Sequence, residues 1–148
     1  REIITGKIGV IGFSMGAAAI LMANSQDIKC IVSDSSYAVL NNILSGVFSQ
    51  SGALRELVTV MSKMYARIFL GLDARAIAPA HYIAGMRIPI LLIHCIRDTT
   101  IPSSEAQRLH KAYPQAQLWL IPRGDHGESF IANEYENTTL SFFRAHLQ

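Results

Sequence analysis

The sequence has little charge and no cluster of one sign. Only 16% of its 148 residues are charged, and 13 basic against 11 acidic residues give a net charge of +2. Proteins that bind nucleic acid need clustered Lys and Arg to neutralise phosphates, so the sequence disfavours a nucleic-acid partner. With 50% hydrophobic residues it is also the reverse of a disordered segment. We expect residues 1–148 to form one compact domain, or part of a larger one.

Cysteines and long hydrophobic runs are also scarce. Cys30 and Cys95 both lie in apolar stretches, which predicts two buried hydrophobic side chains rather than a disulfide. We therefore expect a reducing compartment, the cytoplasm. No apolar run approaches the roughly 18 residues of a membrane span, and the longest, residues 88–93, has the length of a strand.

Metal and cofactor motifs are missing as well. Neither H-E-x-x-H nor C-x-x-C occurs, and the glycines at positions 6, 9, 12 and 16 do not form G-x-G-x-x-G. We expect no metal and no cofactor.

Strand and helix patterns alternate along the chain. Apolar, β-branched runs predict four strands: Ile8–Phe13, Lys29–Ser33, Pro89–Ile96 and Leu118–Ile121. Helices are expected over Ala17–Ala23, from Ser103 or Ser104 to Tyr113, and over most of Glu128–Leu147 with Leu140, Phe142, Phe143 and Leu147 as apolar anchors. Strands that are apolar at nearly every position are typical of a parallel sheet covered on both faces. The predicted class is α/β, with a mostly parallel sheet and flanking helices.

The segment from about residue 37 to residue 72 has a different character. Apolar residues recur at helical spacing between Leu54 and Ile68, which predicts an amphipathic helix of about four or five turns. This helix is either a cap over a binding site or an ordinary helix that faces the core. Residues 76–86 are expected to be a short helix or a loop around Pro79.

Residues 12–16, Gly-Phe-Ser-Met-Gly, fit the motif G-x-S-x-G between the first strand and the first helix. A serine on such a sharp turn is forced into a strained backbone conformation, and flanking glycines let strand and helix approach closely. The motif in this place predicts a nucleophile elbow at Ser14.

A serine hydroxyl needs a base to take its proton and a carboxylate to orient that base. Asp98 follows the third predicted strand and His126 follows the fourth. Both therefore lie at the carboxyl ends of parallel strands, the edge that presents Ser14 and at which open α/β sheets place their sites.

Three segments resemble the α/β-hydrolases of the esterase, lipase and serine-aminopeptidase type: GFSMG, IPILLIHCIRDTTIP and RGDHGE. The resemblance covers nearly the whole chain and corresponds to strands five to eight of that fold. It implies that Ser14 is the nucleophile, Asp98 the acid and His126 the base, and that the backbone N–H of Met15 is one oxyanion donor. Cys95 departs from the glycine that many relatives have there.

The larger departure is that strands one to four of that fold, and the loop with the second oxyanion donor, have no counterpart before Ser14. The chain also begins at Arg1 rather than Met. We expect a fragment or a separately produced half. The strand Ile8–Phe13 would then be an exposed edge, which predicts a homodimer or association with a missing N-terminal half.

Two functions follow from the resemblance. The first is hydrolysis of a small acyl substrate, a carboxylic ester or less readily an amide, through an acyl-enzyme; serine aminopeptidase and thioesterase activities stay open. The second is a catalytically incomplete fragment or assembly module of such a hydrolase.

Other side chains compete for the same roles. Asp34 also follows a strand and is an alternative acid, whereas Asp125, next to His126, is expected to be loop structure or surface. The remaining histidines are expected to be a core residue, His94, a solvated residue, His110, and two residues without a partner pattern, His81 and His146.

Overall fold

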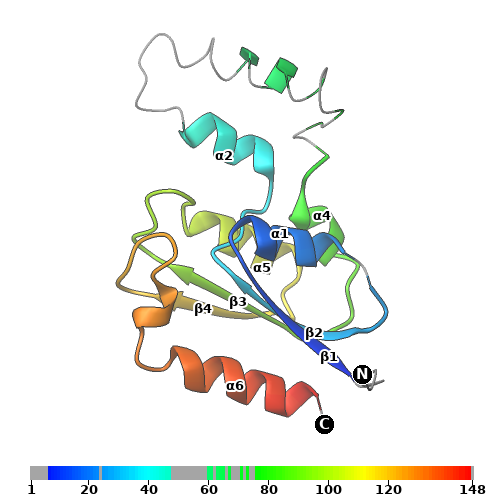
Figure 1. Cartoon of the computed structure of the whole chain (residues 1–148), viewed down its shortest axis with the longest axis vertical. Coiled ribbons are helices and arrows are strands. Elements are labelled where there is room, and N and C mark those ends of the chain that lie inside the picture. The colour runs from blue at the N-terminus through cyan, green and yellow to red at the C-terminus, as the bar shows by residue number, and fades with distance from the viewer. Residues whose placement is uncertain are drawn as a thin grey trace, which may run out of the picture.

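The computed structural model describes residues 7–23, 25–47, 60–61, 63–65, 67, 71, 73 and 76–147. Its centre is a four-stranded sheet in the order β1-β2-β3-β4, with every neighbouring pair parallel (Figure 1). The strands are β1 (Ile8–Phe13), β2 (Ile28–Asp34), β3 (Ile90–Cys95) and β4 (Gln117–Ile121). The predicted α/β class with a parallel sheet is confirmed.

Helices cover both faces of this sheet. The helices of the described ranges include α1 (Met15–Met22), α2 (Leu40–Val47), α4 (Pro79–Ile83), α5 (Ser104–Ala112), the short 3-10 helix η2 (Ser129–Ile131) and α6 (Tyr135–His146). In Figure 1, α1, α4 and α5 lie on one side of the sheet and α6 on the other. No helix in these described ranges is long and apolar enough to cross a membrane.

Strand β3 shows why the sheet is covered on both sides. All six of its residues are buried, and successive side chains point to opposite faces. Ile90 and Leu92 pack in one core cluster with Leu21 of α1 and Leu109 of α5. On the other face, Leu91 and Ile93 pack in a second cluster with Phe142 of α6. Both clusters depend on a strand that is apolar at almost every position.

The last predicted helix is interrupted. Between η2 and α6 the backbone of Ala132 is extended, so residues 128–147 form two helices rather than one. Phe142 is only 5% exposed, but Leu140 is 40% exposed and is therefore not the anchor that the pattern predicted. Two residues differ by about 200° around a helix, which turns Leu140 away from the side that carries Phe142.

Half of the predicted cap-like segment, residues 37–72, lies outside the described residues, including most of the helix predicted between Leu54 and Ile68. Helix α2 begins this segment, and residues 60–61 and 63–65 are helical. Met61, Met64 and Tyr65 are about half exposed, at 52%, 48% and 57%. A role for this segment as a cap stays a prediction. The short helix predicted around Pro79 corresponds to α4.

Candidate active site

Ser14 lies on the turn between β1 and α1 and has a strained backbone. Its φ of 52° and ψ of −120° fall where non-glycine residues are rare. Its backbone N–H donates to the carbonyl oxygen of Asp34 at 2.8 Å, which fixes the turn to the end of β2. The strain expected at this position is confirmed.

The two glycines of the motif are not equivalent. A Cβ atom at Gly12 would lie 2.8 Å from the backbone of Ala17 and Gly16, closer than real Cβ atoms come. At Gly16, a Cβ would meet no atom within 4 Å outside its own helix. The predicted steric need for glycine is therefore confirmed at position 12, but the structure gives no such reason at position 16.

Asp98 follows β3 and is nearly buried, with 7% of its surface exposed. Its Oδ1 accepts the backbone N–H groups of Thr100 at 2.9 Å and Ile101 at 2.7 Å. Burial by itself would raise the pKa of the carboxyl group, but hydrogen bonds from His94, Ile101 and His126 outweigh it and hold the pKa of Asp98 below its usual range. Asp98 is therefore a carboxylate.

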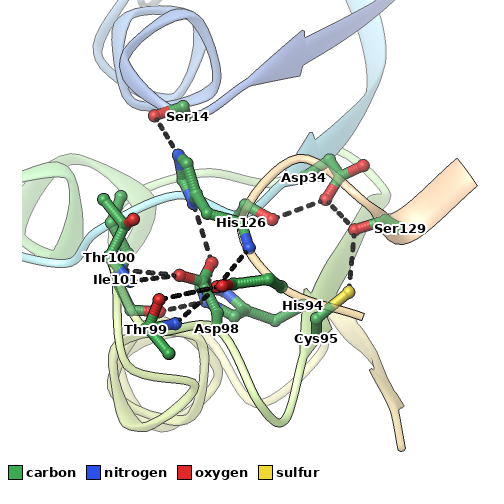
Figure 2. Close-up of polar contacts among 12 residues, drawn as sticks. Ser14, Asp34, His94, Cys95, Asp98, Thr99, Thr100, Ile101, His126 and Ser129 are labelled. Atoms are coloured by element: carbon green, nitrogen blue, oxygen red, sulfur yellow. Dashed lines mark hydrogen bonds and ion pairs between the residues drawn. The ribbon is translucent and has the colours of Figure 1, made fainter. Parts of the chain in front are cut away.

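His126 lies in the loop after β4, between Ser14 and Asp98 (Figure 2). Its Nδ1 is 2.8 Å from Oδ2 of Asp98, and its Nε2 is 3.0 Å from Oγ of Ser14. Because a carboxylate only accepts, Nδ1 carries the proton, and the neutral ring presents a lone pair on Nε2 to the serine hydroxyl. The ring of Phe13 packs against the imidazole at 4.9 Å between centroids. The structure thus brings together the three residues that the sequence singled out.

Met15 follows Ser14 on the same turn, and its side chain is 74% exposed. Its backbone N–H stands at the amino end of α1, where N–H groups have no acceptor within the helix.

Asp125 ties together the two loops that carry Asp98 and His126. Its Oδ1 accepts the backbone N–H of Thr99 at 2.8 Å, the Thr99 hydroxyl at 2.9 Å and the backbone N–H of His126 at 2.7 Å. These bonds, led by the one from the Thr99 backbone, lower the pKa of Asp125. Its carboxylate binds backbone groups of both loops, and the sequence alone did not reveal this bridge.

Asp34, the alternative acid, binds other groups. Its carboxylate accepts hydroxyl groups from Ser35 at 3.0 Å, Ser129 at 2.7 Å and Tyr135 at 2.9 Å. Burial, and then the charge and hydrogen bond of Asp34, raise the pKa of Tyr135. Asp34 therefore joins β2 to η2 and α6, and the structure places Asp98 rather than Asp34 against His126 (Figure 2).

The other histidines and the cysteines differ in their surroundings. His94 is fully buried, as expected, and its Nε2 contacts Ile101 and Asp98. The expectation that His110 is solvated was wrong in part, because its Nδ1 is buried. His146, for which no partner was expected, packs its ring against Phe142 at 4.7 Å. The thiols of both cysteines are buried and free, and burial raises the pKa of each.

Within the described ranges, no three His, Cys, Asp or Glu side chains come close enough together to hold a metal ion.

The parallel sheet with helices on both faces puts the chain in the α/β class, and the solved structures that it resembles, described below, include α/β-hydrolases. Within that class, the model of the family described as Serine hydrolase (FSH1) matches residues 6–127. The chain belongs to this family of serine hydrolases.

Two curated relatives are similar over most of the chain. The uncharacterized protein YfhR of Salmonella typhi is 26% identical over 144 residues, which are 95% of this chain and 44% of that protein. The uncharacterized protein YqkD of Bacillus subtilis is 29% identical over 146 residues, 93% of this chain and 48% of that protein. The chain thus spans less than half the length of these relatives.

Solved structures share the fold. The Pyrococcus furiosus esterase Pf2001 superposes with a TM-score of 0.73 and 25% identity, over 96% of this chain and 55% of that one. The Pyrococcus horikoshii acylaminoacyl peptidase gives a TM-score of 0.70 and 19% identity, over 97% of this chain and 24% of the other. At that identity, the likeness to the peptidase concerns the fold alone.

Proposed function

We propose that Ser14, His126 and Asp98 form a catalytic triad that hydrolyses carboxylic esters through an acyl-enzyme. The observation that carries this proposal is the unbroken line of contacts from Ser14 Oγ to His126 Nε2, 3.0 Å, and from His126 Nδ1 to Asp98 Oδ2, 2.8 Å. Membership of a serine hydrolase family supports the same chemistry.

In the acylation half-reaction, Oγ of Ser14 attacks the carbonyl carbon of the ester while Nε2 of His126 takes the hydroxyl proton. Asp98 stabilises the imidazolium ion through the Nδ1–H bond. The negative oxygen of the tetrahedral intermediate is held by the N–H of Met15, at the positive end of α1. Return of the Nε2 proton to the leaving alkoxide breaks the ester bond and leaves an acyl group on Ser14.

Deacylation repeats these steps with water. His126 takes a proton from the water as its oxygen attacks the acyl carbon, and then gives a proton back to Oγ of Ser14 as the acid leaves. The same two contacts of His126 therefore serve both half-reactions.

The choice of an ester substrate is supported by the likeness to the Pyrococcus furiosus esterase. Amides and thioesters undergo the same attack but differ in the leaving group. A panel of p-nitrophenyl esters of increasing acyl length, aminoacyl p-nitroanilides and acyl thioesters separates these classes. Turnover of the p-nitroanilides or thioesters above that of every ester would replace the ester assignment.

The triad itself is tested by matched substitutions. Ser14→Ala should lower kcat by several orders of magnitude, and Asp98→Asn by roughly 10⁴-fold, because an asparagine favours the wrong tautomer of His126. Asp34→Asn is the control, since it makes the same change in a buried carboxyl group that binds Ser129 and Tyr135. The control should keep most of the activity. Hydrolysis that survives Ser14→Ala would remove the assignment.

A second candidate function is an assembly module that is catalytically incomplete by itself. It is favoured by strand β1, an edge of the described sheet in which Ile8, Ile11 and Phe13 are 46%, 51% and 45% exposed. A fluorophosphonate, which reacts only with an activated serine, separates the two functions. Labelling of Ser14 in the 148-residue chain supports the hydrolase, and a folded chain that is not labelled supports the module.

A further inference from the structure

His94 is a buried histidine that contacts the proposed acid. It lies on β3, has no exposed surface, and its Nε2 is 2.8 Å from the carbonyl oxygen of Ile101 and 3.3 Å from Oδ2 of Asp98. Its other ring nitrogen, Nδ1, is buried without a hydrogen-bond partner among the described residues. Figure 2 shows His94 beside Asp98 and below His126.

These contacts determine the proton on the ring. A carbonyl oxygen only accepts, so Nε2 of His94 must carry the hydrogen that points to Ile101 and Asp98. A second proton on Nδ1 would bury a charged N–H without an acceptor, which costs more than leaving a lone pair unpaired. His94 is therefore the neutral Nε2–H tautomer.

We propose that His94 is a positioning residue for Asp98, holding its Oδ2 in line with His126 by sharing the Nε2–H between that oxygen and the Ile101 carbonyl. The effect of His94 on catalysis rests on the function proposed above. Its effect on the position of the Asp98 carboxylate does not depend on that function.

Four donors converge on the carboxylate of Asp98. The backbone N–H groups of Thr100 and Ile101 bind Oδ1, while His126 and His94 approach Oδ2. A carboxylate has about four lone-pair sites, so this set leaves it no freedom to rotate. Ile101 is bound to Asp98 through its N–H and to His94 through its carbonyl, so His94 fixes the turn as well as the acid.

His94 and His126 compete for the same oxygen. Without the His94 donor, more of the negative charge of Oδ2 faces Nδ1 of His126, and the imidazolium form of His126 is stabilised. The other titratable groups around this site are Asp125, beside His126, Cys95 on β3, and Asp34 and Glu128, whose charges act on Cys95. All of these remain in place when only His94 is changed.

The decisive experiment is NMR of the chain labelled with ¹⁵N-histidine, because ring nitrogen shifts report tautomer and titration without requiring turnover. In the unmodified chain, His94 should be the Nε2–H tautomer, as its contact with the Ile101 carbonyl requires. An Nδ1–H tautomer would overturn the proposal. This arm needs no substitution and so cannot fail through misfolding.

Three variants extend the test. His94→Leu keeps roughly the volume but removes the donor, and should move the titration midpoint of His126 upward by some tenths of a pH unit or more. His94→Gln keeps an N–H near the Nε2 position and should restore the midpoint. His110→Leu removes another histidine with a buried Nδ1 and should leave the midpoint unchanged. If His126 had the same titration midpoint in His94→Leu and His94→Gln, His94 would contribute only to core packing.

Kinetics then connect the position of Asp98 to activity. His94→Leu should lower kcat for ester hydrolysis about 10- to 100-fold with little change in KM, the size of effect expected for a misplaced reacting group, and His94→Gln should recover most of it. If Ser14 proves inactive while the His126 midpoint still shifts, the proposed function fails and the positioning role stands. If Ser14 is active but His94→Leu changes neither the His126 midpoint nor kcat, the positioning role fails while the proposed function stands.

Discussion

The glycines on either side of Ser14 differ in the space around them, and this difference gives a stability prediction for single residues. Gly12→Ala puts a Cβ atom 2.8 Å from backbone atoms of Ala17 and Gly16, so β1 and α1 must move apart. We expect a loss of about 1–3 kcal/mol in the free energy of unfolding, typical of overpacking. Gly16→Ala is the matched control, because it meets open space inside a helix and should be neutral or stabilising by up to about 1 kcal/mol.

Chemical denaturation of both variants measures these two values. An equal loss of stability at both positions would mean that the crowding at Gly12 is not what requires glycine there.

Single residues were predictable from the sequence where a motif fixed them. Ser14 came from the spacing of G-x-S-x-G, and Asp98 and His126 from their place after successive strands. The shared donor of His94 was missed, although a histidine four residues before an aspartate at the end of a strand was a usable signal. The bond between Asp34 and Ser129 joins residues 95 positions apart, and no local pattern predicts such a pair.

At the scale of elements, the loops after β3 and β4 are held together by Asp125. Asp125→Ala removes the acceptor of the backbone N–H groups of Thr99 and His126. We expect kcat to fall about tenfold or more with KM little changed, because His126 loses its fixed distance from Ser14 and Asp98.

Steady-state kinetics on an ester measures this effect. Thr99→Val is the milder comparison, since it removes the hydroxyl contact with Asp125 and leaves the backbone N–H bond. Unchanged kinetics in Asp125→Ala would show that the two loops hold their places without the bridge.

The elements that the sequence predicted best are the strands with continuous apolar runs. β1 agrees with its predicted bounds although it is an edge strand, and the fully buried β3 differs by one residue at each end, because an apolar run with turn residues on both sides leaves little choice. The end of the chain was less predictable, since the break at Ala132 depends on how η2 and α6 pack against the sheet. Such contacts between distant elements leave no periodic signal.

At the scale of the whole molecule, Asp98 makes stability depend on pH. Its pKa is lower in the folded chain than the ordinary value of 3.8, so it binds a proton less readily than in the unfolded chain. Its contribution to the free energy of unfolding is therefore complete above about pH 4 and is lost as the pH falls through the folded pKa.

Denaturation of the unmodified chain and of Asp98→Asn at a series of pH values isolates this contribution, because Asp125 and the other carboxyl groups are common to both. The difference in unfolding free energy between the two should shrink as the pH falls below about 4. A constant difference would indicate that Asp98 has the same pKa in both states.

The exposed edge of the sheet gives a prediction about association. A strand with unpaired backbone groups and exposed apolar side chains pairs with another strand when one is offered. We expect the chain to form a dimer through β1 at high concentration, and Ile11→Lys, which puts a charge on this edge, to weaken it. Light scattering over a range of concentrations measures the association. A chain that stays monomeric at its highest soluble concentration would contradict this prediction.

Labelling with a fluorophosphonate followed by peptide mass spectrometry measures directly whether His126 and Asp98 activate Ser14. We expect one adduct per chain, on Ser14, formed at a similar rate in Asp34→Asn, much more slowly in His126→Ala and not at all in Ser14→Ala. A folded chain that acquires no adduct, or acquires it on another serine, would show that Ser14 is not activated in this way.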